Sequence, residues 1–500
     1  MSQRRGRGDI AIIGMACVFP GAKNLESYWN NILRKVDAVS DPPPDWEADY
    51  YFDPASQTND RTYCKRGGYL GALAEFNPVE LGIMPNAVDG TEPDHFLALR
   101  AAAEALADAG YADAAKLSAH KERTEVIIGR GTYVNRGNTT AIQHSVVLDS
   151  VLRVLHQLHP EHTKDELDLI RRELKASLPP FHSDTAPGLV PNIISGRIAN
   201  RLDLMGSNYV VDAACASSLV AVDLAMTDLL SGRCDMAIAG GVHASTPATI
   251  LVIFSQLKAL SRKGEIRPFD QDADGTLLGE GVGMLVMKRR EDAERDGDRI
   301  YALIKGIGIA SDGRALGLLA PRLEGEELAL RRAYDAAGVD PASVELIEAH
   351  GTATPVGDAV EVEALNQLFG PKPEGPPRCA LGSVKSMISH TMPASGSAGM
   401  IKAALALHHR VLPPTLHCEN PSPKLHLETS NFYLNTETRP WIHGSRETPR
   451  RAGVNAFGFG GINAHAVLEE YNGPNTAPWL QREWDIELFV VSAATREELP

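Results

Sequence analysis

A cysteine at the junction of a strand and a helix is the residue of this sequence best placed for nucleophilic chemistry. Residues 209–212 are typical of a strand, Ala213-Ala214 of a tight turn, and residues 216–230 of a largely apolar, buried helix. Cys215 therefore begins a helix, where the helix dipole and free backbone N–H groups favour a thiolate. The alternative is that Cys215 is a small buried residue with a packing role and no chemical role. The strand, turn and helix around Cys215 weaken this alternative.

Two histidines could assist such a nucleophile. His350 ends a predicted strand and begins a Gly/Thr-rich loop, and His390 follows Lys385 in a Gly/Ser/Lys-rich loop. A thiol with histidines at strand ends is the arrangement expected for covalent catalysis on an acyl group. A single histidine at a strand end is usually an ordinary core residue. Two of them in such loops favour a catalytic role.

The elements that must position these residues indicate an α/β fold. Short β-rich apolar runs alternate with Ala/Leu-rich helical patterns. Residues 98–131 and 329–351 both follow the order helix, glycine, strand, glycine, and residues 10–14 resemble residues 302–306. We therefore expect two related halves packed as one body, because one copy alone would leave a sheet face bare. Chance similarity between Ala-rich helices remains the alternative.

The halves are expected at residues 9–258 and 259–471. Within the first, residues from about 139 to 187 are rich in His and Glu and predict an inserted helical element. Residues 472–500 begin with a turn-rich linker and continue into the start of a new strand. We expect this tail to be the truncated beginning of a further unit in a longer polypeptide.

Composition excludes several classes of protein. The 500 residues are 43% hydrophobic and 23% charged, which is typical of a globular chain rather than a disordered or fibrous one. The net charge of −15 leaves no basic footprint for nucleic acid or anionic lipid. Six single cysteines without a C-x-x-C pair indicate a reducing compartment. Since no apolar run is long enough to cross a bilayer, we expect no membrane span and a cytoplasmic location.

Three local patterns imitate other functions. Basic residues precede the apolar run 10–19 as in a secretory signal, but Asp9 and the shortness of the run favour a buried strand. The histidines of residues 156–162 could suggest a metal site, but Pro160 would break the helix that aligns them. The acidic run 270–275 imitates a calcium loop that has the wrong residue at its twelfth position. We expect no metal site.

Four segments in chain order resemble the β-ketoacyl synthase (ketosynthase) domain of type I polyketide synthases. They are residues 212–218 (DAACASS), 350–358 (HGTATPVGD), 385–390 (KSMISH) and 455–463 (NAFGFGGIN). Residues 63–68 and 195–200 also resemble the ketosynthases of bacterial polyunsaturated fatty acid and related lipid synthases. The tail from Glu487 is similar to the linker that precedes an acyltransferase domain.

The resemblance implies a thiolase fold, layered αβαβα from two duplicated halves, and usually a homodimer. It implies a β-ketoacyl-[acyl carrier protein] synthase, in which a cysteine-bound acyl chain condenses with a malonyl thioester that loses CO2. The domain would bind no cofactor itself, because its substrates arrive on the phosphopantetheine arm of an acyl carrier protein. A downstream acyltransferase and other synthase domains would be further partners, and a basic patch near the pocket mouth would receive the acidic carrier.

The resemblance also assigns roles to single residues. Cys215 would accept the acyl chain, and His350 and His390 would hydrogen-bond the malonyl thioester oxygen and stabilise the enolate. Lys385 would pair with Glu361 to set the electrostatics of the site. Further supporting roles fall to Asp358, to the backbone N–H groups of Cys215 and Phe459 as an oxyanion hole, to Gly458 and Gly460 around the Phe459 gate, and to Thr352 and Thr354 on the pantetheine arm.

One departure from the family pattern lies beside the second histidine. Met387-Ile388-Ser389 replaces the common Asn-Ile-Gly. Because Ser389 is small, we expect His390 to keep its place.

The alternatives to a condensing enzyme are a non-extending ketosynthase that acts as decarboxylase or dimer scaffold, a thiolase and a cysteine hydrolase. A non-extending member typically lacks the cysteine, and a thiolase would need a second one acting as a base.

Overall fold

The structure, a computed structural model, describes residues 8–88, 91–131, 136–181, 186–315, 317–372, 375–443, 448–473 and 495. The strands of its large sheet are β1 (Ile10–Val18), β2 (Thr124–Arg130), β3 (Asn208–Val211), β4 (Met236–His243), β5 (Gly281–Arg289), β6 (Ala302–Ser311), β7 (Leu346–Glu348), β8 (Cys379–Gly382), β10 (Phe432–Leu434), β12 (Arg451–Gly458) and β13 (Ile462–Glu469). A small separate sheet pairs β9 (Val411–Leu412) with β11 (Arg439–Pro440).

The order of strands reveals an internal duplication. The large sheet runs β10-β8-β7-β12-β13-β6-β1-β5-β4-β2-β3. From β1 outwards, successive pairs with β5, β4, β2 and β3 are antiparallel, antiparallel, parallel and parallel. From β6 outwards, the pairs with β13, β12, β7 and β8 follow the same sequence. The two related halves expected from the sequence are thus confirmed, joined by antiparallel pairing of β1 with β6.

The pairing places β5 in the first repeat, between β1 and β4. The strand-based repeat therefore extends to Arg289, further along the chain than the division at 258/259 expected from the sequence. A strand's sheet partners lie far away in the sequence, so local patterns carry little information about them.

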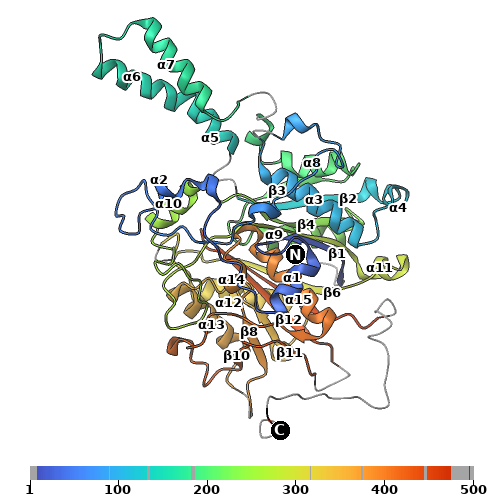
Figure 1. The fold of residues 1–500 in the computed structure, drawn as a ribbon. Helices are drawn as coiled ribbons and strands as arrows, with labels where there is room; N and C mark the ends of the chain where they lie inside the picture. Colours follow the sequence, from blue (N-terminus) through green and yellow to red (C-terminus); the bar gives the residue numbers. More distant parts are fainter. Residues whose placement is uncertain are drawn as a thin grey trace.

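Helices cover the repeats in layers (Figure 1). The inner layer holds α9 (Ser217–Leu230) and α15 (Ser395–His409), and the outer layers hold α3 (Pro93–Asp108) and α8 (Ile193–Arg201) on one side and α12 (Leu323–Ala337) and α13 (Pro355–Phe369) on the other. Successive side chains of β1 point to opposite faces of the sheet. Ile10 and Ile12 pack in the core around α9 and α15. Ala11 and Ile13 pack in the core around α3. The two repeats of the sheet lie between these three helix layers. Together they form the αβαβα arrangement that the family resemblance implies.

The two inner helices approach closely. A Cβ at Gly396 would lie 2.6 Å from Ser218 Oγ, so only glycine fits there. Ser218 Oγ accepts a hydrogen bond from the Ser397 N–H at 2.9 Å. This contact fixes the first turn of α9 against the first turn of α15, and so couples the Cys215 turn to the segment that follows His390.

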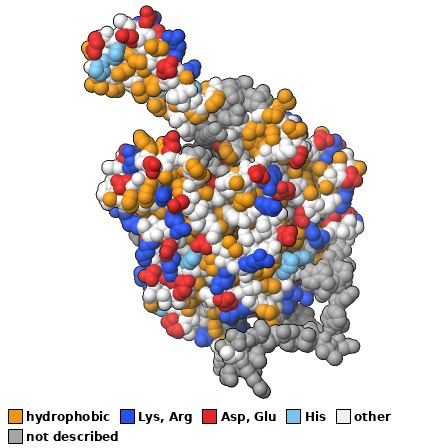
Figure 2. Space-filling view, viewed as in Figure 1, with side chains coloured by type: hydrophobic (Ala, Val, Ile, Leu, Met, Phe, Trp, Pro, Cys, Tyr) orange, Lys and Arg blue, Asp and Glu red, His pale blue; other side chains and the backbone are white. Residues whose placement is uncertain are grey.

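A helical hairpin stands away from the layered body (Figures 1 and 2). It consists of α5 (Arg136–Ile142), a π turn at Gln143–Val147, α6 (Leu148–Leu158) and α7 (Lys164–Ser177), in the region where the sequence predicts an inserted helical element. The remaining helices are α1 (Leu25–Leu33), α2 (Ala48–Tyr51), α4 (Ala114–Ser118), α10 (Ala248–Gln256), α11 (Arg290–Asp296) and α14 (Lys385–Ile388). No helix in the described ranges is long and apolar enough to span a membrane. The strand predicted to begin at Glu487 lies outside the described residues.

Candidate active site

Cys215 lies in a tight turn between β3 and α9, as the sequence predicts, and is 6% exposed. Ala214 adopts the left-handed conformation, with φ of 48°, which is uncommon for a residue with a side chain. Ser217 holds this turn: its Oγ accepts from the Ala213 N–H at 2.9 Å and donates to the Ala214 carbonyl at 2.5 Å. The strain at Ala214 sets the position of the thiol at the helix start.

Two further segments close around this turn. Ser395 Oγ donates to the Cys215 carbonyl at 3.2 Å. On the opposite side, a Cβ at Gly458 would lie 2.6 Å from the Ala213 carbonyl oxygen. The end of β12 can therefore approach the turn only because residue 458 is glycine.

Burial raises the pKa of the Cys215 thiol to about 11, and the Lys385 cation and the backbone N–H groups of Phe459 and Cys215 offset this only in part. The sequence predicts that the helix start lowers the pKa of this thiol. In the structure the pKa is raised instead. Desolvation of the thiolate outweighs the stabilising groups because the whole turn is packed. The resting group is therefore a thiol, and any reaction that uses Cys215 as a nucleophile must remove its proton.

His350 follows β7 and is held through its backbone by Glu361. The Glu361 carboxylate accepts from the N–H groups of His350 at 2.6 Å and Gly351 at 2.8 Å, and from Asn455 Nδ2 at 2.8 Å. The Phe457 N–H donates to His350 Nδ1 at 3.3 Å. Since Nδ1 accepts, a neutral His350 carries its proton on Nε2.

His390 lies beside His350, with ring centroids 5.3 Å apart and ring planes at 90°. Its backbone is fixed by two hydrogen bonds, from its N–H to the Leu277 carbonyl and from the Gly279 N–H to its own carbonyl, both 2.8 Å. Burial first, and then the Lys385 cation, lowers the pKa of both histidines well below the ordinary value. Both rings are therefore neutral at pH 7.

Lys385 does not form the expected ion pair with Glu361. Within the described residues no ion pair joins them, and burial lowers the pKa of Lys385 while the charges of Glu348 and Glu361 partly restore it. Glu348 is instead paired with Lys402, Nζ to Oε2, at 2.6 Å. Glu361 is occupied by the three donors around His350, so Lys385 acts on the site as a nearby cation and not as an ion-pair partner.

Ser389 shows the cost of the departure from the family pattern. It is fully buried, has φ of 64°, and its Oγ has no hydrogen-bond partner among the described residues. A left-handed φ favours glycine. Serine is small enough to leave His390 next to His350, but the position carries both backbone strain and an unpaired hydroxyl.

The loop after His350 carries the two threonines, and Asp358 lies in the first turn of α13, which follows this loop. Thr352 Oγ1 and Thr354 Oγ1 are 3.2 Å apart. Asp358 accepts from the Phe269 N–H at 2.8 Å, and burial raises the pKa of Asp358 to about 7. Asp358 thus supports the loop from beneath by binding backbone N–H groups.

Phe459 lies at the open side of the site and is 42% exposed. Its ring stacks on Phe254, with centroids 5.8 Å apart and planes at 21°. Gly460 and Gly461 both have positive φ, of 87° and 74°, and so form a turn that residues with side chains rarely adopt.

One cavity of about 300 Å³ brings most of the predicted residues together. Those that line it are Cys215, His350, Thr352, Thr354, Asp358, Glu361, His390, Gly458 and Phe459; Lys385 and Gly460 lie outside its lining. The other walls are largely apolar, formed by Phe254, Leu257, Leu318, Leu319, Pro321 and Val356. A thiol and two neutral imidazoles thus share one apolar cavity.

Sequence reasoning missed several residues of this site. Asn463 donates to Asp312 Oδ1 at 2.7 Å, which ties the glycine turn to the end of β6. Asn463 stands in a motif that carries the family resemblance, and that signal could have found it. Asp312, Glu326 and Ser395 had no such signal, because their importance comes from segments that meet only in the fold.

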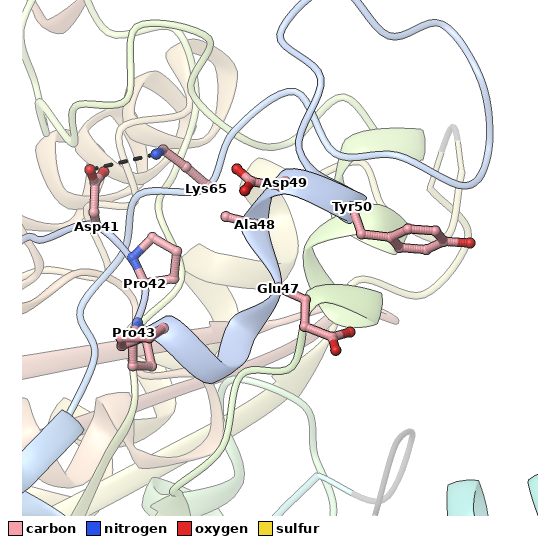
Figure 3. A pocket seen from close by; sticks show the side chains of 9 residues that line it. Asp41, Pro42, Pro43, Glu47, Ala48, Asp49, Tyr50 and Lys65 are labelled. Atoms are coloured by element: carbon pink, nitrogen blue, oxygen red, sulfur yellow. Dashed lines mark ion pairs between the residues drawn. The ribbon is translucent and has the colours of Figure 1, made fainter. Parts of the chain in front are cut away.

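A more open hollow of about 600 Å³ lies elsewhere on the surface (Figure 3). Its described lining residues are Asp41 to Pro44, Glu47 to Tyr50 and Lys65. Asp41 and Lys65 form an ion pair across it at 3.6 Å. None of these described lining residues carries a thiol or an imidazole.

Comparison with known families and proteins agrees with this geometry. Residues 7–293 match the β-ketoacyl synthase N-terminal domain, residues 301–419 its C-terminal domain, and residues 421–499 a ketoacyl-synthetase C-terminal extension. A polyunsaturated fatty acid synthase protein from a Thraustochytrium species is 41% identical over 94% of this chain, which spans 17% of that protein. Polyketide synthase PksN of Bacillus subtilis is 38% identical over 95% of this chain, which spans 8% of that protein.

Solved ketosynthases share the fold. The ketosynthase from module 6 of the Bacillus subtilis bacillaene synthase superposes with a TM-score of 0.77 at 35% identity, covering 93% of this chain and 72% of that one. The oxazolomycin ketosynthase domain of Streptomyces albus gives 0.80 at 30% identity, covering 93% and 76%. The layered, duplicated architecture is the thiolase fold of these enzymes, and the chain belongs to the β-ketoacyl synthase family.

Proposed function

We propose that this chain is the ketosynthase of a larger synthase and that it forms carbon–carbon bonds by decarboxylative Claisen condensation. The observation that carries the proposal is the meeting of Cys215, His350 and His390 at one apolar cavity of about 300 Å³. Covalent acyl catalysis needs a nucleophile, and condensation also needs donors for a second, enolate intermediate. This cavity contains groups suited to both.

In the first half-reaction Cys215 Sγ attacks the thioester carbonyl of an acyl carrier protein. The carbon–sulfur bond to the pantetheine breaks, the carrier thiol leaves with the proton of the cysteine, and the acyl chain stays on Cys215. The backbone N–H groups of Cys215 and Phe459 both favour negative charge at this sulfur. We place them as the oxyanion hole, where each donor contributes on the order of 3 kcal/mol.

In the second half-reaction a malonyl thioester loses CO2. The electron pair of the broken carbon–carbon bond becomes an enolate, whose oxygen accepts from Nε2–H of His350 and from His390. The enolate carbon then attacks the acyl-cysteine carbonyl, the carbon–sulfur bond breaks, and the thiolate of Cys215 takes up one proton from solvent. Neutral imidazoles suit this role, because each uncharged ring still carries one N–H group that can donate a hydrogen bond to the enolate oxygen.

The proposed partners are an acyl carrier protein, whose phosphopantetheine arm carries both substrates, a second copy of this chain, and a downstream acyltransferase with other synthase domains. Support for a homodimer comes from β3, a terminal strand of the sheet, since edge strands readily pair with another copy. The six buried, unpaired cysteines support a reducing compartment such as the cytoplasm.

The carrier surface is proposed at exposed cations near the cavity mouth. Lys258 stands between the lining residues Leu257 and Ala259, and Arg314 lies on the segment that leads to Leu318. Reversal of Lys258 or Arg314 to Glu should weaken turnover with carrier-bound substrate and leave turnover with free pantetheine thioesters unchanged. Lys175→Glu, on the projecting hairpin, is the matched control.

The non-extending alternative is not favoured, because the cysteine that such ketosynthases typically lack is present and lines the cavity. The deciding experiment supplies an acyl-pantetheine thioester and malonyl-carrier protein and measures the product by mass. We expect a β-ketoacyl carrier protein from the wild type and none from Cys215→Ala. Decarboxylation of malonyl-carrier protein without any condensed product would favour the non-extending function.

A further inference from the structure

Glu326, in the first turn of α12, is a buried carboxyl group at the wall of the cavity that contains Cys215. It is 2% exposed and lines the cavity. Its Oε2 is buried and has no hydrogen-bond partner among the described residues. Buried polar atoms in folded proteins nearly always have a partner, so this one requires an explanation.

The charged groups around Glu326 are carboxyl groups, which supply no donor to its Oε2 when ionised. Its charged neighbours are Glu361 and Asp312. The Glu361 oxygens accept from the backbone of His350 and Gly351 and from Asn455. The remaining neighbour, Asp312, accepts from Asn463. The backbone and amide donors in these contacts are thus already used by the other two carboxyl groups.

These surroundings favour the neutral form of Glu326. Burial, followed by the negative charges of Glu361 and Asp312, raises the pKa of Glu326 well above its ordinary range. A protonated carboxyl group has an O–H donor as well as acceptor oxygens. In this wall Glu326 therefore offers a hydrogen-bond donor where an ionised carboxylate would only accept.

The first turn of α12 is held firmly in place. A Cβ at Gly325 would lie 2.0 Å from Asp312 Oδ1, so the helix approaches the end of β6 as closely as only glycine allows. Arg322 Nη1 also donates to the Asp312 carbonyl at 2.9 Å. A side chain on such a fixed turn is well suited to recognise one atom of a ligand.

We propose that Glu326 is a specificity-determining residue that donates a hydrogen bond to a carbonyl or hydroxyl oxygen of the thioester substrate in this cavity. The proposal rests on the proposed function. Besides the reacting thioester carbonyl, two parts of a carrier-bound substrate hold such oxygens: the amides and hydroxyl of the pantetheine arm, and the β-position of the acyl chain. Most of the remaining wall is apolar, so an oxygen placed here would find few other donors.

The consequence is discrimination between substrates. A buried donor that meets its oxygen stabilises the complex, and the same donor left unpaired by a substrate without that oxygen costs binding energy. Removing the donor should therefore weaken binding of the preferred thioester. The difference in KM between thioesters with and without the oxygen should become smaller.

The test compares Glu326→Met and Glu326→Ala, which remove the donor, with Glu326→Gln, which keeps a donor of similar size. Acylation of Cys215 is measured with butyryl and 3-hydroxybutyryl groups, each on pantetheine and on the shorter N-acetylcysteamine. We expect KM for the recognised thioester to rise about tenfold in the Met and Ala variants, with kcat little changed, and to return to within about threefold in the Gln variant. Glu327→Gln, on the neighbouring position outside the cavity lining, should behave as wild type.

The pattern across substrates identifies the oxygen. A loss confined to pantetheine thioesters points to the part of the arm that N-acetylcysteamine lacks, and a loss confined to 3-hydroxybutyryl groups points to the chain. An equal loss with all four thioesters points to an oxygen that they share, the thioester carbonyl or the amide nearest the sulfur. Unchanged KM for all four thioesters in both donor-free variants would overturn the inference while leaving Cys215 acylation intact. Failure of the proposed function would look different, because the wild type itself would then form no acyl-cysteine.

Discussion

The backbone N–H of Phe457 lies 3.3 Å from Nδ1 of His350 and donates to it. This contact joins β12 to the loop after β7 and fixes the tautomer of a neutral His350, so that Nε2 carries the proton. The same loop is anchored by Glu361. Nε2 of a neutral His350 is thus a hydrogen-bond donor, as the role proposed for it at an enolate requires.

Loss of either histidine should separate the two half-reactions. His350→Ala and His390→Ala are expected to keep acylation of Cys215, because the thiol and its backbone donors remain. Decarboxylation of a malonyl thioester should fall about 10²- to 10³-fold in each, as when an oxyanion-hole donor is removed. Release of CO2 and acyl-enzyme mass are the measurements, with exposed His426→Ala as the control. Equal loss of acylation and decarboxylation would contradict the division of roles.

Replacement of Lys385 by Met should move the pH profile of decarboxylation. The Lys385 cation disfavours the imidazolium forms and so lowers the pKa of His350 and His390. Without it both pKa values rise, the rings protonate at higher pH, and the acid limb of the decarboxylation rate shifts upwards in pH. Profiles of wild type, Lys385→Met and the exposed-site control Lys424→Met check this. A limb that stays in place, or moves to lower pH, would show that Lys385 does not act through its charge.

Ser389→Gly should stabilise the protein. Glycine relieves the left-handed φ of 64° and removes a buried hydroxyl without a described partner, and together these gains exceed the extra chain entropy of glycine. We expect about 1 kcal/mol more stability in denaturant unfolding, with acylation unchanged. Ser389→Val should destabilise, because a branched side chain fits this φ poorly. A less stable glycine variant would mean that the serine hydroxyl contributes a favourable contact.

The glycines beside Phe459 should differ in their effects. A Cβ at Gly458 would meet the Ala213 carbonyl at 2.6 Å, so Gly458→Ala must displace the loop from the Cys215 turn. Acylation should fall about 10²-fold, the effect of misplacing groups by about an ångström. Gly460 has open space but φ of 87°, so Gly460→Ala should cost about 1 kcal/mol of stability and leave acylation within about threefold. Similar acylation rates in both variants would show that close approach at residue 458 is unimportant.

Local sequence predicted the parts of the site that local structure creates. The Cys215 turn, the strand before His350 and the glycines around Phe459 are each specified within a few residues, and the structure contains all of them. The duplication was also visible, since both copies retain the order of helix, glycine and strand. The pairing of β5 with the first repeat could not be predicted this way, because it depends on contacts with β1 and β4.

The electrostatics of the site depend on tertiary packing and were predicted less well. A helix start favours a thiolate, but the depth of burial that raises the pKa of Cys215 to about 11 appears only in the fold. The expected partner of Lys385 proved to be engaged with the backbone of His350 and Gly351. Glu326 gave no signal, because a glutamate in the first turn of a helix is ordinary until its surroundings are known.

We propose that Cys215 carries the acyl chain, and intact-protein mass spectrometry examines this role. The wild type and Cys215→Ala are each incubated with a short and a long acyl-pantetheine thioester and then with malonyl-carrier protein. We expect one acyl adduct on the wild type, none on the variant, and discharge of the adduct as a β-ketoacyl product on malonyl addition. An equal adduct on Cys215→Ala, or no adduct on the wild type with either thioester, would contradict it.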